Sequence, residues 1–283
     1  MLGGVVAVVV AAGQGRRFGG PTPKQFLPLR GLPVLAHTLR ALAVPGLVDR
    51  LVLAVPEGET GRRRDEIVGP QGLAVPVALV PGGAERQDSV RAGLAAAGEA
   101  EIVVVHDGVR PFVPRRDLEA VIAAARAHGA AILATPVTDT LKRAAADGRV
   151  EATVSREGLW AALTPQAFRR EVLLRAHLEA AARAASLENA AAARAASLEN
   201  AAAARAASLR ADAGVAAPAP PATDDALLVE RLGLPVAIVP GARTNIKITS
   251  PADLAVAEAL LTWWATRRVP FESTDPVPGD EVA

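Results

Sequence analysis

Residues 5–15 read VVAVVVAAGQG, six apolar residues that run into a glycine-rich turn. Apolar residues without polar alternation indicate a strand buried on both faces, which is typical of a parallel sheet. Similar short runs, bounded by proline, glycine or aspartate, recur at 50–55, 75–80, 101–106 and 130–136. The sequence therefore predicts at least five strands in one buried sheet.

Helical patterns separate these runs, at 34–43, 88–97, 116–127 and 252–266. Strands that alternate with helices predict an α/β fold with a parallel or mostly parallel sheet and flanking helices. Ligands of such sheets bind beyond the carboxyl ends of the strands, so the loops there are the candidate site. We expect a single domain over residues 1–268, followed by a flexible tail at 269–283.

The composition narrows the function classes. The chain has 283 residues, 51% of them hydrophobic, and its 31 basic and 30 acidic residues leave a net charge of +1. Without a global field there is no general attraction for nucleic acid or an anionic membrane. The chain has no cysteine, which excludes disulfides, thiolate metal sites and a cysteine nucleophile. The start does not resemble a secretory signal, and arginines interrupt the long apolar stretch at 180–207, so we expect a soluble, cytoplasmic protein.

Two segments depart from the strand–helix alternation. Residues 137–155 predict a hairpin that leaves the main sheet, with its turn at Ala146-Asp147-Gly148. Residues 181–222 form a low-complexity insertion in which RAASLENAAAA occurs twice, at 183–193 and 194–204, and begins again at 205. Its alanine content predicts one helix from about Arg170 to Ala211, roughly 60 Å long.

The repeat can be interpreted in two ways. Its 11-residue period places Leu187, Leu198 and Leu209 on one stripe, as in an arm that packs against a partner helix. The alternative, which we favour, is a largely solvated helix tolerated as an insertion, because one leucine per three turns buries little surface. A proline-rich linker at 216–221 follows.

Three loops carry residues suited to phosphate chemistry. The first combines Gly13 and Gly15 with the cations Arg17 and Lys24, and its backbone amides can cradle phosphate oxygens. It is neither a Walker A loop nor a dinucleotide fingerprint, because the G-K-[ST] ending and a third glycine are missing. The second loop, at 82–89, has two glycines followed by Asp88 or Ser89 at the start of a helix. This pattern suits the recognition of a flat ring, and it is equally typical of an ordinary loop that ends in a helix N-cap.

The third loop follows the 101–106 strand and begins with Asp107. A carboxylate at the end of a buried strand, facing a phosphate loop, is a natural ligand for Mg²⁺. His106 points to the opposite face of the strand, so we expect it to be packed rather than catalytic.

Six motifs now stand in order along the chain: AAG-x-G-x-R with PKQ, GG-x-x-R-x-x-S, HD-x-x-RP, DT-x-KR, R-x-x-LW-x-x-LTPQ and NIKIT. Together they resemble the 2-C-methyl-D-erythritol 4-phosphate cytidylyltransferases of the non-mevalonate isoprenoid pathway. The resemblance covers nearly the whole chain apart from 181–222 and the tail. It implies a Rossmann-like fold, a homodimer joined by a β-arm at 137–155, and cytidylyl transfer from CTP to a polyol phosphate with Mg²⁺.

The resemblance also implies roles for individual residues. CTP would be bound by Ala11, Ala12, Gly13, Gly15, Gly83, Ala84, Arg86 and Ser89. Arg17, Lys24 and Lys247 would be catalytic, and Asp107 would hold Mg²⁺. The second substrate would meet Arg110, Thr140, Arg156, Thr223, Asp224 and Lys247, with Thr140 and Arg156 coming from the neighbouring subunit.

Two other functions remain open at this stage. A pentitol-phosphate cytidylyltransferase, acting on ribitol 5-phosphate, would share most of the motifs, although the LW-x-x-LTPQ run favours the isoprenoid enzyme. A non-catalytic CTP-binding scaffold is disfavoured by the complete set of charged residues. Lysine usage supports an enzyme: only three of the 31 basic residues are lysine, and Lys24, Lys142 and Lys247 all lie in the motifs.

Overall fold

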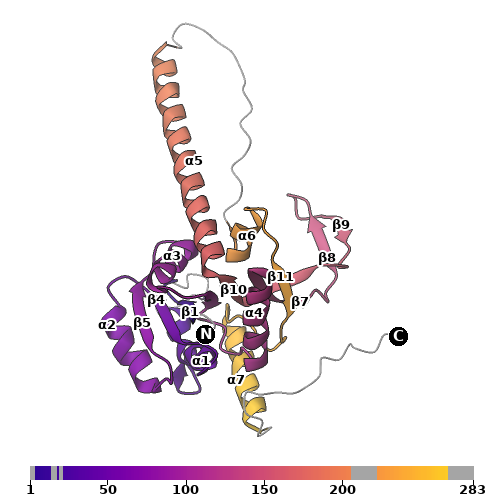
Figure 1. Cartoon of the computed structure of the whole chain (residues 1–283). Coiled ribbons are helices and arrows are strands. Elements are labelled where there is room, and N and C mark those ends of the chain that lie inside the picture. Colours follow the sequence, from indigo (N-terminus) through magenta and orange to yellow (C-terminus); the bar gives the residue numbers. More distant parts are fainter. Residues whose placement is uncertain (1–3, 14–17, 19–21, 205–221, 267–283) are drawn as a thin grey trace.

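The computed structural model describes residues 4–13, 18, 22–204 and 222–266. A seven-stranded sheet forms its centre, in the order β11-β7-β10-β6-β1-β4-β5 (Figure 1). All neighbouring strands are parallel except β10, which runs antiparallel to both β6 and β7. The predicted α/β fold with a mostly parallel sheet is confirmed.

The elements of the main sheet and its helices have the following bounds. The strands are β1 Val5–Val10, β4 Arg50–Val55, β5 Val77–Pro81, β6 Ile102–Asp107, β7 Ala130–Pro136, β10 Trp160–Arg169 and β11 Ala237–Pro240. The helices are α1 Val34–Leu42, α2 Thr60–Arg63, α3 Arg86–Ala96, α4 Arg115–His128, α5 Arg170–Ala204, α6 Asp225–Glu230 and α7 Pro251–Thr266. Two strand pairs lie outside the sheet: β2 Pro28–Leu29 with β3 Leu32–Pro33, and β8 Leu141–Ala144 with β9 Val150–Val154.

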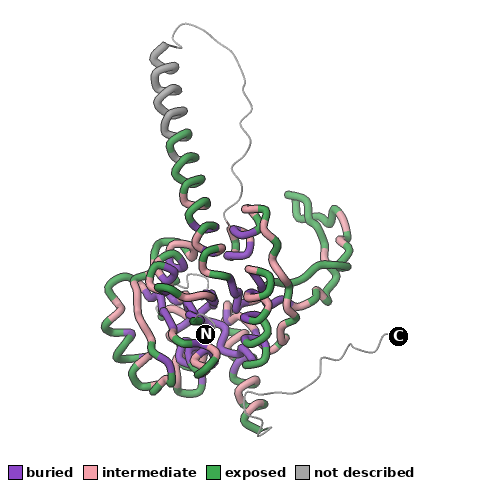
Figure 2. The backbone as a smooth tube through the Cα atoms, viewed as in Figure 1, coloured by how far each residue is buried: buried purple, intermediate pink, exposed green. Residues whose placement is uncertain are grey.

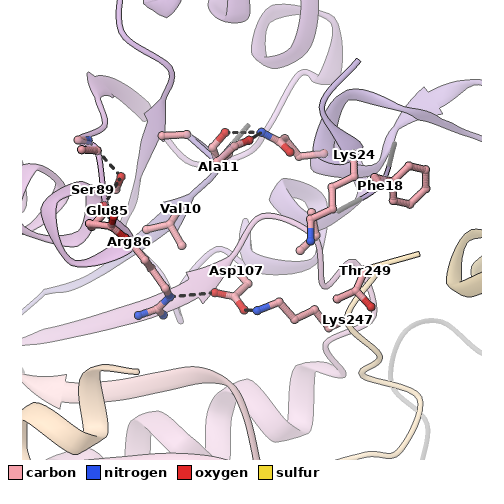
Figure 3. Close-up of a pocket in the computed structure, with 16 residues that line it drawn as sticks. Val10, Ala11, Phe18, Lys24, Glu85, Arg86, Ser89, Asp107, Lys247 and Thr249 are labelled. Atoms are coloured by element: carbon pink, nitrogen blue, oxygen red, sulfur yellow. Dashed lines mark hydrogen bonds and ion pairs between the residues drawn. The ribbon is translucent and has the colours of Figure 1, made fainter. Parts of the chain in front are cut away.

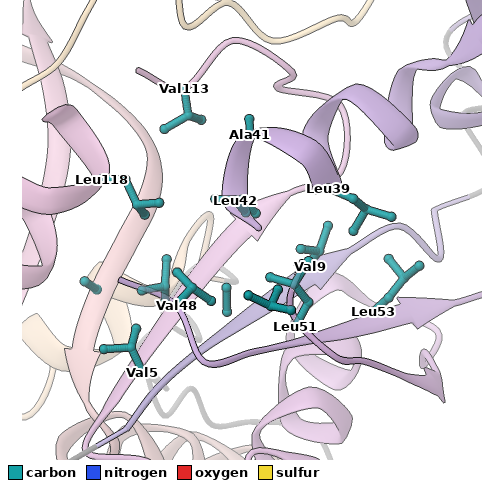
Figure 4. Packing of buried hydrophobic residues seen from close by; sticks show 14 of the residues in the cluster. Val5, Val9, Leu39, Ala41, Leu42, Val48, Leu51, Leu53, Val113 and Leu118 are labelled. Carbon is teal, nitrogen blue, oxygen red and sulfur yellow. The ribbon is translucent and has the colours of Figure 1, made fainter. Parts of the chain in front are cut away.

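Alternation along β1 produces two separate cores. Val5, Ala7 and Val9 face the helices α1 and α4, and Figure 4 shows part of this cluster. Val6 and Val8 face α3, α6 and the beginning of α5 on the other side of the sheet. Both faces of the sheet are therefore covered, which is why its strands are apolar without alternation.

The helix α1 shows how the packing follows from the sequence. Leu35, Leu39 and Leu42 recur at helical spacing and are fully buried against the sheet. Each contributes roughly 1.5–3 kcal/mol relative to an exposed side chain.

Most of the predicted elements are confirmed, and one large one is missing from the prediction. The strands at 5–10, 50–55 and 130–136 agree residue for residue, and the other predicted elements agree to within two residues. The sequence did not predict β10, because Pro165 lies in its middle, where a central strand rarely tolerates proline. The strand accommodates it where the pairing with β7 shifts register between Ala162 and Gln166. The short elements β11 and α6 were not predicted either.

The hairpin predicted at 137–155 is present. It leaves the sheet after β7 and returns through β10, and its strands β8 and β9 pair only with each other within the described part of the chain (Figure 1). Nearly all of its residues are exposed (Figure 2). In the single chain, the outer edges of β8 and β9 are therefore exposed to solvent.

The helix α5 has a buried root and a projecting extension. Leu173, Ala176 and His177 are at most 3% exposed, whereas Leu178 is 62% and Leu187 is 47% exposed. Both complete repeats, 183–193 and 194–204, are helical and extend away from the domain (Figure 1). The predicted continuation to Ala211 and the linker at 216–221 lie outside the described residues, as does the tail at 269–283.

None of the helices in the described part of the chain combines the length and apolarity needed to cross a membrane.

Candidate active site

A cavity of about 570 Å³ opens at the carboxyl ends of β1 and β6 (Figure 3). The chain runs from β1 outward to β4 and β5 and then crosses back to β6, which lies on the other side of β1. The topology of the sheet therefore reverses between β1 and β6. Ligands of open α/β sheets bind at such points. All three predicted phosphate-chemistry loops reach this cavity, and its lining comprises Val10, Ala11, Ala12, Gly13, Phe18, Lys24, Gln25, Gly83, Ala84, Glu85, Arg86, Ser89, Asp107, Val109, Lys247 and Thr249.

A buried glutamine shapes the first loop. The side-chain amide of Gln25 donates to the carbonyl oxygens of Ala11 at 2.7 Å and Gly13 at 2.8 Å. Gln25 is 2% exposed, so these bonds satisfy an otherwise unpaired buried amide. They hold the loop against the turn that carries Lys24. Gly15 and Arg17 lie outside the described residues.

The second loop depends on a close approach of backbone and side chains. A Cβ on Gly82 would lie 2.3 Å from the Cβ of Ala12, so the first two loops can meet only because residue 82 is glycine. The hydroxyl of Ser89 accepts from the amide of Gly83 at 3.2 Å and donates to the carbonyl of Glu85 at 3.3 Å. Ser89 is therefore placed to brace this loop within the cavity wall.

Helix α3 begins earlier than predicted. It starts at Arg86, two residues before Asp88, and a reciprocal capping box joins Glu85 to Asp88. This places Arg86 in the first turn of the helix, with its side chain directed into the cavity (Figure 3).

Asp107 is the electrostatic centre of the cavity. Its carboxylate oxygens lie 2.8 Å from Lys247 Nζ, 3.3 Å from Arg86 Nε and 3.8 Å from Arg110 Nε. Burial alone would raise the pKa of Asp107, but the positive charges of Arg86, Lys247 and Arg110 outweigh it and hold that pKa well below its usual range. Asp107 is therefore an anion at any physiological pH.

Lys24 and Lys247 enter the cavity from the side opposite Arg86 (Figure 3). Lys24 lies in a single 3-10 turn, Lys24–Phe26, and Lys247 lies in the loop before α7. That loop is fixed by Ile248, which is fully buried in a cluster with Phe112 and Ala257 and donates its amide to Val109. Three cationic residues, Lys24, Arg86 and Lys247, and two acidic ones, Glu85 and Asp107, thus line a space large enough for a nucleotide.

A second cavity of about 400 Å³ shares Lys247 with the first. Arg110 and Arg243 also line it. Arg110 is 8% exposed and donates from Nη1 to the carbonyl of Asn245 at 2.8 Å; burial lowers its pKa. This cavity is cationic, and Lys247 stands at its boundary with the first.

The remaining predicted substrate residues are not among those that line these cavities. Thr140 and Arg156 are exposed on the hairpin, where Arg156 donates to the carbonyl of Thr138. Thr223 is exposed, and Asp224 caps α6 by accepting from the amide of Leu227 at 3.0 Å. Asp224 also accepts from Gln166, so its carboxylate is engaged in fixing α6 to β10.

His106 is packed, as predicted. It is fully buried, with Nε2 2.9 Å from the carbonyl of Arg110 and Nδ1 2.9 Å from the hydroxyl of Thr164. Burial lowers its pKa to about 4. It supports the wall behind Asp107.

Sequence reasoning missed the residues behind the lining. Gln25 belongs to the PKQ motif, which predicts no role for it. Asp225 and His177 belong to none of the six motifs, although both are buried and contact each other at 2.9 Å. A Thr-Asp pair before an apolar run could have indicated the start of α6. No local pattern could have paired His177 with Asp225, because they are far apart in sequence.

Comparisons with known proteins agree with this geometry. Residues 5–207 and 205–263 match the family model described as 2-C-methyl-D-erythritol 4-phosphate cytidylyltransferase. The enzyme of that name from Pelotomaculum thermopropionicum is 45% identical over 258 residues, covering 91% of this chain and 94% of its own. The one from Syntrophus aciditrophicus is 43% identical over 258 residues, covering 91% and 95%.

Solved structures give the same result. The crystal structure of 2-C-methyl-D-erythritol 4-phosphate cytidylyltransferase from Thermus thermophilus superposes with a TM-score of 0.66 at 33% identity, covering 93% of this chain and all of that one. The 4-diphosphocytidyl-2C-methyl-D-erythritol synthase from Anaerococcus prevotii gives 0.67 at 26% identity, with 92% and 99% covered. Because the family model matches residues 5–207 and 205–263, and the relative from Pelotomaculum thermopropionicum covers 91% of the chain, the chain belongs to the 2-C-methyl-D-erythritol 4-phosphate cytidylyltransferase family.

Proposed function

We propose that the protein joins CTP to 2-C-methyl-D-erythritol 4-phosphate and releases pyrophosphate. Family membership over nearly the whole chain supports the reaction. The structural observation that carries the proposal is the pair of adjoining cationic cavities that share Lys247. The larger one accommodates the nucleotide, and the smaller one accommodates the polyol phosphate.

The proposed chemistry is an in-line displacement at the α-phosphorus of CTP. An oxygen of the substrate phosphate forms the new bond to phosphorus, and the bond to the β-phosphate oxygen breaks, so that pyrophosphate leaves with the electron pair. A phosphate monoester is already anionic, so no general base is needed, which agrees with a neutral, packed His106. Lys24 and Lys247 stabilise the charge that develops on the phosphoryl oxygens, and Arg17 belongs to the same proposal.

Mg²⁺ is part of this proposal, with Asp107 as its ligand. Asp107 lines the cavity, and its Oδ2 lies 2.8 Å from the cationic Nζ of Lys247, so the carboxylate suits a cation there. Among the described residues no three His, Cys, Asp or Glu side chains gather as a metal cage. One carboxylate together with phosphate oxygens and water is a usual environment for Mg²⁺. When bound, the ion would neutralise phosphate charge.

A homodimer formed through the hairpin is also proposed. The hairpin exposes two strand edges, which isolated sheets rarely leave uncovered. Val150 on β9 is 65% exposed, and Leu159 and Trp160 at the base of the hairpin are 37% and 38% exposed. A partner that covered this apolar surface would bring Thr140 and Arg156 to the neighbouring site.

A cytoplasmic location belongs to the same proposal, because both substrates are phosphate anions, and charged groups are costly to transfer into a bilayer.

The deciding experiment measures pyrophosphate release with CTP and either methylerythritol phosphate or ribitol 5-phosphate. We expect turnover with the first and at least tenfold lower kcat/KM with the second. Addition of EDTA should abolish turnover, and excess Mg²⁺ should restore it. A preference for ribitol 5-phosphate would contradict the proposed substrate, and release that is indifferent to EDTA would contradict the metal.

A further inference from the structure

A chain of charged side chains leads from the nucleotide cavity into the domain. Arg86 contacts Asp107 through Nε at 3.3 Å and Asp225 through Nη1 at 2.6 Å. The other oxygen of Asp225 accepts from His177 Nε2 at 2.9 Å. Asp225 begins α6 and His177 lies near the start of α5, so two helices outside the cavity are connected to its central carboxylate.

Asp225 lies completely out of solvent. It is 0% exposed, and its two oxygens are each used by one donor, His177 and Arg86. Burial would raise the pKa of Asp225, but the hydrogen bond from His177 and the charge of Arg86 lower it, so the carboxylate is ionised. An ionised carboxylate at this depth is costly unless it is paired, and here its pairing determines where Arg86 lies.

Arg86 contacts two carboxylates, and it lies closer to Asp225 than to Asp107. The contact with Asp225, at 2.6 Å, is 0.7 Å shorter than the contact with Asp107, at 3.3 Å. A guanidinium anchored in this way remains on the cavity wall with its exposed face available to a ligand; its side chain is 27% exposed. If Asp225 lacked charge, Asp107 would be the stronger attraction for Arg86.

The backbone around Asp225 is fixed independently of Arg86. Gln166 on β10 accepts from the amides of Asp225 and Ala226, and it donates to Asp224. The carboxylate of Asp225 is thus preorganised by the sheet before any ligand enters.

We propose that Asp225, oriented by His177, is a positioning residue that holds Arg86 on the cavity wall, where it contacts the triphosphate of the nucleotide instead of closing onto Asp107. The inference rests on the proposed function, because it names what fixes one of the nucleotide-binding residues. It assigns a role at the active site to the root of α5, the helix that carries the repeats.

The first test replaces Asp225 with asparagine, which matches its shape but has one acceptor for two donors, so either His177 or Arg86 must face an amide N–H. We expect the Kd for CTP, measured by calorimetry, to rise about tenfold or more, the loss typical of weakening one hydrogen bond to a charged group. The KM for CTP should rise in parallel, and the KM for the polyol phosphate should stay within twofold. Glu101→Gln is the matched control: Glu101 pairs with Arg126 at the opposite end of β6, and CTP binding should not change.

A double-mutant cycle separates positioning from general structure. If Asp225 acts through Arg86, adding Asp225→Asn to Arg86→Ala should cause no further loss of CTP affinity. A second pair tests His177: His177→Gln retains an N–H that can reach Asp225 and should bind CTP nearly as the wild type does, whereas His177→Leu should show part of the Asp225→Asn defect. The His177 pair also decides the matter if Asp225→Asn does not fold.

The inference is overturned if Asp225→Asn binds CTP as tightly as the wild type, if its defect adds in full to that of Arg86→Ala, or if the two His177 variants behave alike. A fall in kcat with both KM values unchanged would show a loss of active protein and would also overturn it. Wild-type protein that binds no CTP would overturn the proposed function as well, so the two failures are distinguishable.

Discussion

At the scale of single residues, the site is a balance of charge around one carboxylate. Asp107 is surrounded by Arg86, Arg110 and Lys247, so an incoming anion meets an excess of positive charge, although the chain as a whole carries only +1. Two of the three lysines line the cavity, and the third, Lys142, lies on the hairpin and donates to Thr153. The scarcity of lysine therefore correctly indicated that Lys24 and Lys247 lie at the candidate site. Lys142 instead contacts a residue of the hairpin.

Lys24 is the residue whose loss we expect to be most costly. Lys24→Ala should lower kcat by roughly 10²–10⁴ with an unchanged Tm, because it removes a charge that stabilises the transition state. Lys24→Arg should recover little, since a planar guanidinium cannot occupy the site of a compact ammonium. Pyrophosphate release and thermal melts measure both effects. An arginine variant with full activity would contradict the assigned role.

The buried His106 makes stability depend on pH. Its pKa is about 4 in the fold and ordinarily 6.5, so between these values the unfolded chain binds more protons than the folded one. Unfolding free energy should therefore fall as the pH drops from 6.5 to 4, by on the order of 3 kcal/mol from this residue. Denaturant titrations at several pH values measure the slope.

A matched pair of variants isolates this effect. His106→Gln should flatten the slope, and His128→Gln, which alters an exposed histidine at the end of α4, should leave it unchanged. Some slope will remain in the first variant, because burial also lowers the pKa of His37. An identical slope in both variants would contradict a neutral, buried His106.

At the scale of elements, local patterns predicted what local interactions determine. Unbroken apolar runs gave the parallel strands, and the glycine-rich turns after them gave the cavity loops. The antiparallel β10 was missed because its stability comes from two neighbouring strands, which outweigh an internal Pro165. The same holds for the pairing of Asp225 with Arg86 and for the bracing of the first loop by Gln25: both depend on the packing of distant segments.

In the proposed homodimer, the hairpin would supply residues to the site of the second subunit. If Arg156 completes the neighbouring site, then Lys24→Ala and Arg156→Ala remove residues that belong to the same composite site but come from different chains. Each protein alone should be nearly inactive. Mixing them in equal amounts should restore up to about a quarter of the wild-type activity, because about half of the dimers become heterodimers and one of the two sites in each heterodimer regains both residues. Pyrophosphate release after subunit exchange is the measurement. Mixtures that exchange subunits without regaining activity would contradict a shared site.

At the scale of the whole molecule, a compact catalytic domain carries a long helical projection. The helix α5 has 35 residues, about 52 Å at 1.5 Å per residue, and the side chains described as buried in it, Leu173, Ala176 and His177, all lie in its first turns. His177 lies in these first turns and contacts Asp225, whereas the repeats begin at Arg183, and residues 183–187 are exposed. Because the contact with Asp225 comes from the first turns of α5, we expect that the repeats can vary in number without disturbing the site.

Deleting residues 183–204 tests this separation. The deletion removes two whole 11-residue repeats, and the junction regenerates the sequence RAASL, because residues 205–209 are identical to 183–187. The repeat sequence therefore continues in register across the junction, and His177, which precedes the deletion, keeps its position. We expect a soluble dimer with kcat/KM within about threefold of the full chain, because long surface insertions cost little in loop closure. Steady-state kinetics and light scattering provide the two measurements. A loss beyond tenfold, or a change of oligomeric state, would mean that the projecting helix is an interface or a lid, since the deletion spares every side chain that connects α5 to the cavity.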